Sequence, residues 1–223
     1  MRLVSVEMLR PEMKIARPVY QQEALILPAG RNNVNRFIPN LKNMGIEYVY
    51  VEDDKSEGIE IPDAIAERTR TSCKQLLQSA MQQFSITDKL ETKALESCVG
   101  AVISEILKTP DVQVSLNDIA STDEYTYTHS VSTMVYALMI ARKLNYSEQK
   151  MAMLGMGTLL HDIGKMMIEH EVMFKEGELT QKEYEYVKMH SLYGYQAMRR
   201  ITSVPEQVRQ IAYMHHERLD GSG

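Results

Sequence analysis

Long apolar runs, paired-cysteine motifs and an excess of positive charge are all missing from this chain. Without about 18 consecutive apolar residues, no transmembrane helix is expected. The first 14 residues contain five charged side chains and no apolar block, so no secretory signal peptide is expected either. The two cysteines, Cys73 and Cys98, lack the CxxC spacing of a zinc ribbon, and we expect two reduced thiols.

The charge balance restricts the classes of partner. The chain has 25 Lys and Arg against 30 Asp and Glu, and its net charge of -5 argues against binding to DNA, RNA or an anionic membrane. An anionic substrate would need local positive charge, which bound metal ions can supply. The length of 223 residues, with 44% apolar and 25% charged residues, is typical of a globular protein of one large or two small domains.

Residues 1–58 are predicted to form a small mixed β/α module at the N-terminus. Alternating and β-branched stretches predict strands over residues 3–6, 16–20, 23–27 and 46–51. A helix that starts near Asn33 or Asn35 is expected to end at Gly45. The acidic, glycine-containing stretch 52–58 is a predicted boundary loop.

Residues 59–117 are predicted to be a helical connector. Apolar residues recur at helical spacing in two stretches, and each stretch predicts one helix face. The first face is Leu76, Leu77, Ala80, Met81 and Phe84, and the second is Leu95, Cys98, Val99, Val102, Ile103 and Ile106. Thr109-Pro110 is expected to stop the second helix. The pattern fits a connector, a dimer seam or an ordinary bundle helix.

Residues 118–223 are predicted to be a helical bundle. Three capping boxes start its helices: Ser121 with Glu124, Thr180 with Glu183, and Ser203 with Glu206. The predicted helices span residues 122–143, 148–161, 181–200 and 204–216, with His190 in the middle of the third. The fold class is therefore α+β overall, with a mainly α-helical bundle after the small mixed module.

Histidines are concentrated in this bundle. The chain has six histidines, and five fall in four separate segments: His129, His161, His190, His215 and His216. One of them, His161, is followed directly by Asp162. Each histidine alone would usually be a surface or core residue, but imidazole and carboxylate together are the ligands of Zn, Fe and Mn. His170 follows Glu169 in a charged stretch and is expected to be exposed.

The segment from His161 to Lys165 suggests a particular chemistry. The two oxygens of Asp162 can bridge two ions, and a pair of ions about 3.5–4 Å apart can activate water and hold a phosphoryl group. Lys165 can bind a phosphate oxygen as a point charge. Gly164 permits a close backbone approach or an unusual turn.

These segments resemble the HD-GYP domain of bacteria, a branch of the HD phosphohydrolase superfamily. The resemblance covers about residues 118–223 and is carried by residues 124–131, His161-Asp162 with Lys165, residues 175–180, residues 190–195 and the run from His215 to Gly223. Residues 9–13 and 45–51 are similar to an accessory domain often found before HD-GYP domains.

The resemblance implies a phosphodiesterase that cleaves cyclic di-GMP to pGpG or GMP with two divalent ions, iron or manganese. It implies metal ligands at His129, His161, Asp162, His190, His215 and His216. Asp162 and Lys165 would be catalytic, and Lys165 would also bind the substrate. Because the position four before His129 is Tyr125 rather than Glu, two ions are expected instead of three. The expected location is the cytoplasm, with a homodimer or diguanylate cyclases as partners and no nucleic acid or membrane.

The sequence departs from the HD-GYP pattern at its end. The run Asp220-Gly221-Ser222-Gly223 enters the family signature, but the Tyr-Pro that completes it does not follow. We therefore expect an incomplete HD-type bundle in which the first ion is short of one protein ligand. Two alternatives stay open: an inactive signalling or binding module, and an HD phosphohydrolase for another nucleotide.

Overall fold

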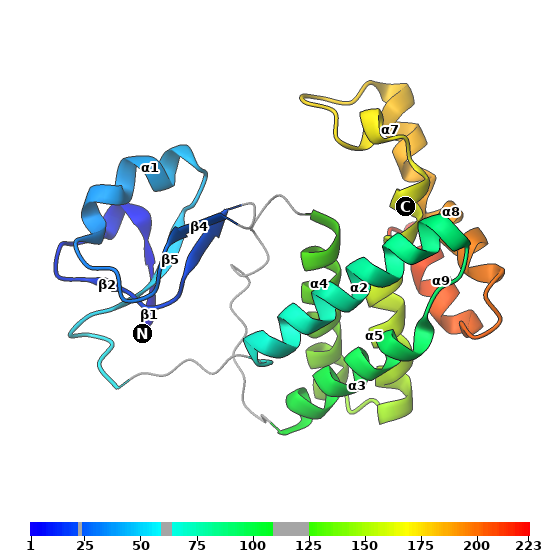
Figure 1. Ribbon diagram of the computed structural model, residues 1–223, viewed down its shortest axis with the longest axis horizontal. Helices are drawn as coiled ribbons and strands as arrows, with labels where there is room; N and C mark the ends of the chain where they lie inside the picture. The colour runs from blue at the N-terminus through cyan, green and yellow to red at the C-terminus, as the bar shows by residue number, and fades with distance from the viewer. Residues whose placement is uncertain (22–23, 59–63, 109–124) are drawn as a thin grey trace. The chain divides into compact units, whose positions relative to one another are not determined.

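The computed structural model describes residues 1–21, 24–58, 64–108 and 125–223. Its described residues fall into two compact units, the first built from residues 1–58 and the second from residues 64–108 and 126–223. Figure 1 shows strands and one short α-helix in the first unit and helices throughout the second. The predicted α+β class with a mainly helical bundle is confirmed.

The first unit contains two small antiparallel sheets. The three-stranded sheet has the order β1-β5-β2, and the other pairs β3 with β4. The elements of this unit are β1 (Arg2–Ser5), η1 (Val6–Met8), β2 (Lys14–Ile15), β3 (Val19–Gln21), β4 (Ala24–Leu27), η2 (Val34–Phe37), α1 (Ile38–Asn43) and β5 (Tyr48–Glu52). The predicted strands are present with shifted ends, and the short strand β2 was missed.

A separate apolar core holds the first unit together. Val49 and Val51 of β5 pack with Ile15 of β2 and with Leu41 of α1. The predicted helix up to Gly45 is divided into the 3-10 turn η2 and the helix α1, because Pro39 sits at the start of α1, where a missing N–H is tolerated. The burial of these side chains is the main stabilising contribution in so small a module.

The second unit is a bundle of helices with one core. Its elements are α2 (Glu67–Thr87), α3 (Thr92–Lys108), α4 (Tyr125–Lys143), α5 (Glu148–Leu160), η4 (Ile163–Met167), α6 (His170–Met173), α7 (Gln181–Lys188), α8 (His190–Arg199) and α9 (Glu206–Met214). Buried side chains of α2 and α3 share this core with those of α4, α5 and α9. Among the described residues, no helix is both long and apolar enough to cross a bilayer.

Two of the predicted helix boundaries are wrong. The helix expected over residues 181–200 is interrupted at Met189, so His190 begins α8 instead of lying in mid-helix. The capping box of Ser203 with Glu206 does not form either, because Pro205 is the N-cap of α9 and Glu206 is its first residue. The box of Thr180 with Glu183 is confirmed. The box of Ser121 with Glu124 lies outside the described residues.

The cysteines differ from the expected reduced pair. Cys73 of α2 and Cys98 of α3 form a disulfide, with their Cα atoms 5.5 Å apart. Both side chains are buried in the core of the second unit. The long sequence separation of the two cysteines gave no indication of this pairing, which depends on how the two helices pack side by side.

Candidate metal centre

Four chain segments of the second unit bring together the six predicted ligands, which are five histidines and the carboxylate of Asp162. The segments are the first turns of α4, the junction of α5 and η4, the start of α8 and the end of α9. The ligand atoms fall into two groups, and within each group they lie within 4.8 Å of one another. The first group is His129, His161 and Asp162, and the second group is His190, His215 and His216.

The first group surrounds Oδ2 of Asp162. Nε2 of His161 lies 3.2 Å from this oxygen and Nε2 of His129 lies 3.8 Å from it. Nζ of Lys165 donates a hydrogen bond of 2.7 Å to the same oxygen. One carboxylate oxygen is thus shared by two imidazoles and an ammonium.

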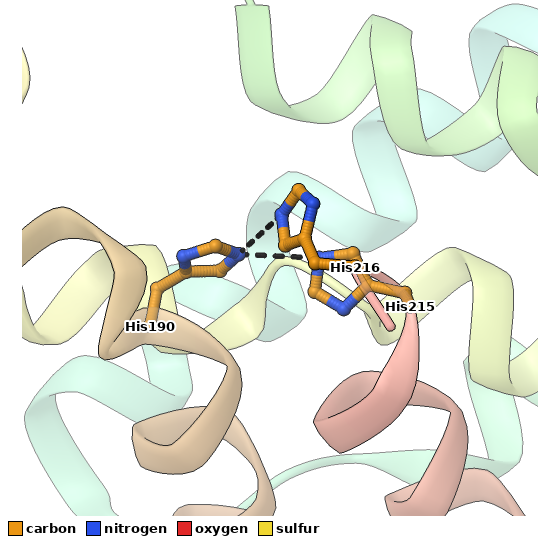
Figure 2. A group of neighbouring side chains, drawn as sticks. All are labelled: His190, His215 and His216. Atoms are coloured by element: carbon orange, nitrogen blue, oxygen red, sulfur yellow. Dashed lines mark hydrogen bonds between the residues drawn. The ribbon is translucent and has the colours of Figure 1, made fainter. Parts of the chain in front are cut away.

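The second group faces the other oxygen of Asp162. Nε2 of His190 lies 3.4 Å from Oδ1, and Nε2 of His215 lies 3.6 Å from it. Figure 2 shows the rings of His215 and His216 turned toward that of His190. Nε2 of His190 is 3.1 Å from Nε2 of His215 and 3.2 Å from Nε2 of His216. Two ligands of one ion, bound at about 2.1 Å and 90–110° apart, are separated by roughly 3.0–3.4 Å, so this spacing is that of a shared ion.

Backbone carbonyls fix the orientation of three of the rings. Nδ1 of His161 lies 2.7 Å from the carbonyl oxygen of Thr158, and Nδ1 of His190 lies 2.6 Å from that of Val187. Nδ1 of His215 has the same relation to a carbonyl three residues before it, at 2.8 Å. A proton on each Nδ1 satisfies these contacts and leaves the lone pair on Nε2, the tautomer that binds a metal.

Asp162 is the buried anion at the centre of both groups. It is 1% exposed, and its Oδ1 has no hydrogen-bond partner within the described part of the chain. Burial raises the pKa of this carboxyl, but the contacts of its oxygens with His161 and His215 and the positive charge of Lys165 outweigh burial and hold the pKa far below its usual range. A buried carboxylate with an unpaired oxygen facing imidazole lone pairs is the donor set that divalent ions of Fe, Mn or Zn take.

Three of the histidines lie in surroundings that favour the neutral ring. Burial lowers the pKa of His129, His190 and His216, because the charged ring loses its hydration. Neutral imidazole is the ligand form, so the environment that lowers these pKa values also favours metal binding.

Gly164 makes the approach of the two groups possible. A Cβ atom at this position would lie 1.8 Å from the carbonyl oxygen of His190 and 2.4 Å from the backbone nitrogen of Gly194. The turn η4 therefore packs backbone to backbone on α8, and this contact places Asp162 beside His190. The close approach that the sequence predicted at Gly164 is present, whereas its partner Gly194 was not identified.

Two further predictions concern residues near this centre. His170 is exposed, as expected, and its ring lies against Phe174 with centroids 4.6 Å apart. The side chain of Tyr125, on which the expectation of two ions depends, lies outside the described residues. The carbonyls of Thr158, Val187 and Ala212 were not predicted, although a histidine at the end of a helix or just after one is a usable signal for such contacts.

Comparisons with known proteins show what this chain is similar to. The model of a family described as "HD domain" matches residues 113–223. A cyclic di-GMP phosphodiesterase of Pseudomonas aeruginosa is 32% identical over 134 residues, which are 60% of this chain and 32% of that protein. A 3'3'-cGAMP-specific phosphodiesterase of Vibrio cholerae is 36% identical over 99 residues, or 44% of this chain and 21% of that protein.

A third relative covers more of the chain. A cyclic di-GMP phosphodiesterase response regulator of Xanthomonas campestris is 32% identical over 159 residues, which are 69% of this chain and 41% of that protein. The chain thus spans less than half the length of each of these three relatives. No solved structure matches.

Proposed function

This chain belongs to the HD domain family, in its HD-GYP branch, and on that premise we propose that it is a metal-dependent phosphodiesterase that hydrolyses cyclic di-GMP. The observation that carries the proposal is the buried carboxylate of Asp162, which turns one oxygen to each of two groups of imidazoles. A carboxylate in this position is suited to joining two ions.

Each of the two groups of ligands would hold one ion. His129, His161 and Oδ2 of Asp162 would hold one ion, and the three histidines of the second group with Oδ1 would hold the other. When bound, such a pair of ions supplies a Lewis acid and lowers the pKa of water. The carbonyl contacts of His161, His190 and His215 keep the ligand rings oriented, so little reorganisation is needed.

Lys165 would bind the scissile phosphate. Its side chain is 15% exposed, and its ammonium lies beside the centre, 2.7 Å from Asp162. An ammonium in a partly dry site attracts a phosphate oxygen more strongly than one in water. This charge offsets the negative balance of the chain where an anionic substrate has to approach.

The identity of the cyclic dinucleotide has a second candidate. Three of the relatives are named for 3'3'-cGAMP, at 29–36% identity to this chain. Cyclic di-GMP and 3'3'-cGAMP share two 3'–5' phosphodiester bonds, so the metal centre suits both. We favour cyclic di-GMP because the relatives that cover most of this chain are named for it.

Iron or manganese is the proposed metal, because a set of histidines with one carboxylate suits both ions. The cytoplasm is the proposed location, since cyclic di-GMP is an intracellular messenger. We also propose that the chain forms a homodimer and contacts diguanylate cyclases.

The test is product analysis with the full chain, purified without chelators and supplied with Mn²⁺ or with Fe²⁺ in the absence of oxygen. Cyclic di-GMP and 3'3'-cGAMP are incubated separately, and the products are identified by chromatography and mass spectrometry. We expect linear pGpG or GMP from cyclic di-GMP. Lys165→Met should lower the rate by about 10²–10³-fold, the usual loss for one electrostatic contact to the reacting group.

Asp162→Asn is the second variant, because it keeps the shape of the side chain and removes its charge. We expect it to lose turnover and metal together. If the chain holds two ions yet releases no product from either dinucleotide, the proposal is wrong. Retained binding of cyclic di-GMP without cleavage would instead support a signalling module.

A further inference from the structure

Building on the proposed function, we propose that the two groups bind metal in a fixed order, the second group first, and that Lys165 weakens the binding of the other ion. The chain would then keep one ion firmly and exchange the other with its surroundings. Activity would follow the supply of the exchangeable ion.

The number of donors differs between the groups. The second group offers three imidazoles, and Oδ1 of Asp162 faces it without a hydrogen-bond partner among the described residues. The first group offers two imidazoles and Oδ2. An ion gains one more protein ligand in the second group, and each additional ligand that is already in place adds affinity.

The spacing of the donors differs as well. The Nε2 atoms of the second group lie 3.1 and 3.2 Å from that of His190, the separation expected of ligands on one ion. In the first group, Nε2 of His129 is 3.8 Å from Oδ2 of Asp162. Measured from Asp162 the two groups are alike, at 3.2 and 3.8 Å in the first and 3.4 and 3.6 Å in the second, so the close spacing of its imidazoles is what distinguishes the second group.

Lys165 donates a hydrogen bond to the carboxylate oxygen of the first group, although its charge also reaches histidines of the second. Its Nζ donates to Oδ2, the oxygen of the first group, at 2.7 Å. An ion in the first group has to share this oxygen with the ammonium or move the ammonium away, and the two positive charges repel each other. Oδ1 faces the second group and receives no hydrogen bond from Lys165.

The order of binding has a functional consequence. The ion that is bound less firmly belongs to the group next to Lys165, where the substrate phosphate would also lie. A phosphate oxygen can draw the ammonium away from Oδ2, which strengthens the binding of that ion. Substrate and exchangeable ion would therefore favour each other's binding, as linkage requires.

The experiment is a Mn²⁺ titration of the full chain without any nucleotide. The chain is first stripped with a chelator and dialysed, and free Mn²⁺ is then followed by its electron paramagnetic resonance signal. We expect two equivalents per chain with dissociation constants at least about tenfold apart, a gap within the range that outer-shell contacts produce. Equal affinities for the two equivalents would overturn the order.

Paired variants assign each step to its group. His129→Ala should keep the tight step and lose the weak one, and His216→Ala should remove the tight step. His216 is exposed, so this substitution leaves the core intact, which circular dichroism can verify. A tight step that survives in His216→Ala, or one that disappears in His129→Ala, would contradict the assignment.

Lys165 is tested by a change of charge. Lys165→Met should tighten the weak step by about tenfold, and Lys165→Arg, which keeps the charge, should leave it weak. A weak step that is unchanged or weakened in Lys165→Met would refute the role of the ammonium. No nucleotide is present in this titration, so its result is independent of the hydrolysis assay. The order of metal binding can be refuted while hydrolysis is observed, and hydrolysis can be absent while the order is observed.

Discussion

Gly164 is the residue on which the metal centre depends most closely outside its ligands. We predict that Gly164→Ala pushes η4 away from α8, because the new methyl group would overlap the carbonyl oxygen of His190. Overpacking of this kind costs about 1–3 kcal/mol or more of unfolding free energy. It should also separate Asp162 from His190, and bound metal should fall to one equivalent or less by elemental analysis.

Gly100→Ala is the matched control for this substitution. Gly100 lies in α3, and a Cβ atom there would meet no atom within 4 Å. Alanine in the interior of a helix is more favourable than glycine by about 0.5–1 kcal/mol, so this variant should be slightly stabilised and keep its metal. Equal metal content in Gly164→Ala and Gly100→Ala would show that the close approach does not position the ligands.

At the scale of single residues, the sequence indicated which side chains come together better than it indicated the contacts that orient them. Histidine and aspartate are metal ligands by residue type, so His161-Asp162 could be recognised as candidate ligands from the sequence alone. The sharing of Asp162 between two groups, with one oxygen for each, depends on the crossing of four chain segments. No local pattern contains that information.

At the scale of elements, α7 and the loop before it are held by Glu183. One of its carboxylate oxygens accepts hydrogen bonds from Lys175 at 2.6 Å and from the backbone nitrogen and side chain of Thr180, each at 2.7 Å. The Lys175 ammonium and Thr180 lower the pKa of Glu183 from 4.5 to about 2. Its folded-state pKa thus lies below the unfolded value, so its contribution to stability is present above the unfolded value and is lost on acidification.

We therefore predict a local opening of α7 as the pH falls from 4.5 toward about 2, the window between the two pKa values of Glu183. The protection factors of the α7 amides, which are the intrinsic exchange rates divided by the observed rates at the same pH, should fall in this window. Glu183→Gln should be less protected already at neutral pH and lose less protection on acidification. Glu178→Gln, an exposed change in the same loop, should behave like the unsubstituted chain. Identical profiles for the two variants would exclude the role of Glu183.

The pairing of α2 with α3 gives a second prediction at this scale. The disulfide of Cys73 with Cys98 closes a loop over a sequence separation of 25 residues. Closing a loop of this length stabilises the fold by about 3.5 kcal/mol in the chain-entropy model. We expect mass spectrometry of unreduced, alkylated protein to find both thiols blocked from reaction.

This prediction also bears on the proposed cytoplasmic location, because disulfides are rare in that compartment. A reducing agent should lower the unfolding free energy of the unsubstituted chain and leave that of a Cys73→Ala, Cys98→Ala variant unchanged. Two alkylated cysteines in protein that was never reduced would instead restore the original expectation of free thiols.

Helix prediction succeeded at one capping box, failed at that of Ser203 with Glu206, and failed again where packing decides a helix end. Thr180 with Glu183 starts α7 as predicted, because both partners of the capping box lie within one turn. No glycine or proline marks the interruption at Met189 in the sequence. The interruption depends on His190 turning toward the centre, which happens only in the folded bundle. The same limit applies to α2 and α3, whose apolar faces fit a connector and a bundle helix equally well.

At the scale of the whole molecule, two separate cores predict two cooperative units. Leu41 belongs to the core of the first unit and Leu159 to that of the second, and both are 0% exposed. Replacing either by alanine should cost about 2–5 kcal/mol of unfolding free energy, from lost burial and the cavity that remains. Because the cores are distinct, each loss should stay within its own unit.

Hydrogen exchange read by mass spectrometry separates the two losses. Leu41→Ala should accelerate exchange in β1 and β5 while α5 and α9 stay protected, and bound metal should be unchanged. Leu159→Ala should accelerate exchange in α5 and release metal, because α5 ends at His161. If Leu41→Ala opened α5 to the same degree as Leu159→Ala, the chain would unfold as one unit, and the first unit would be part of the scaffold that holds the centre.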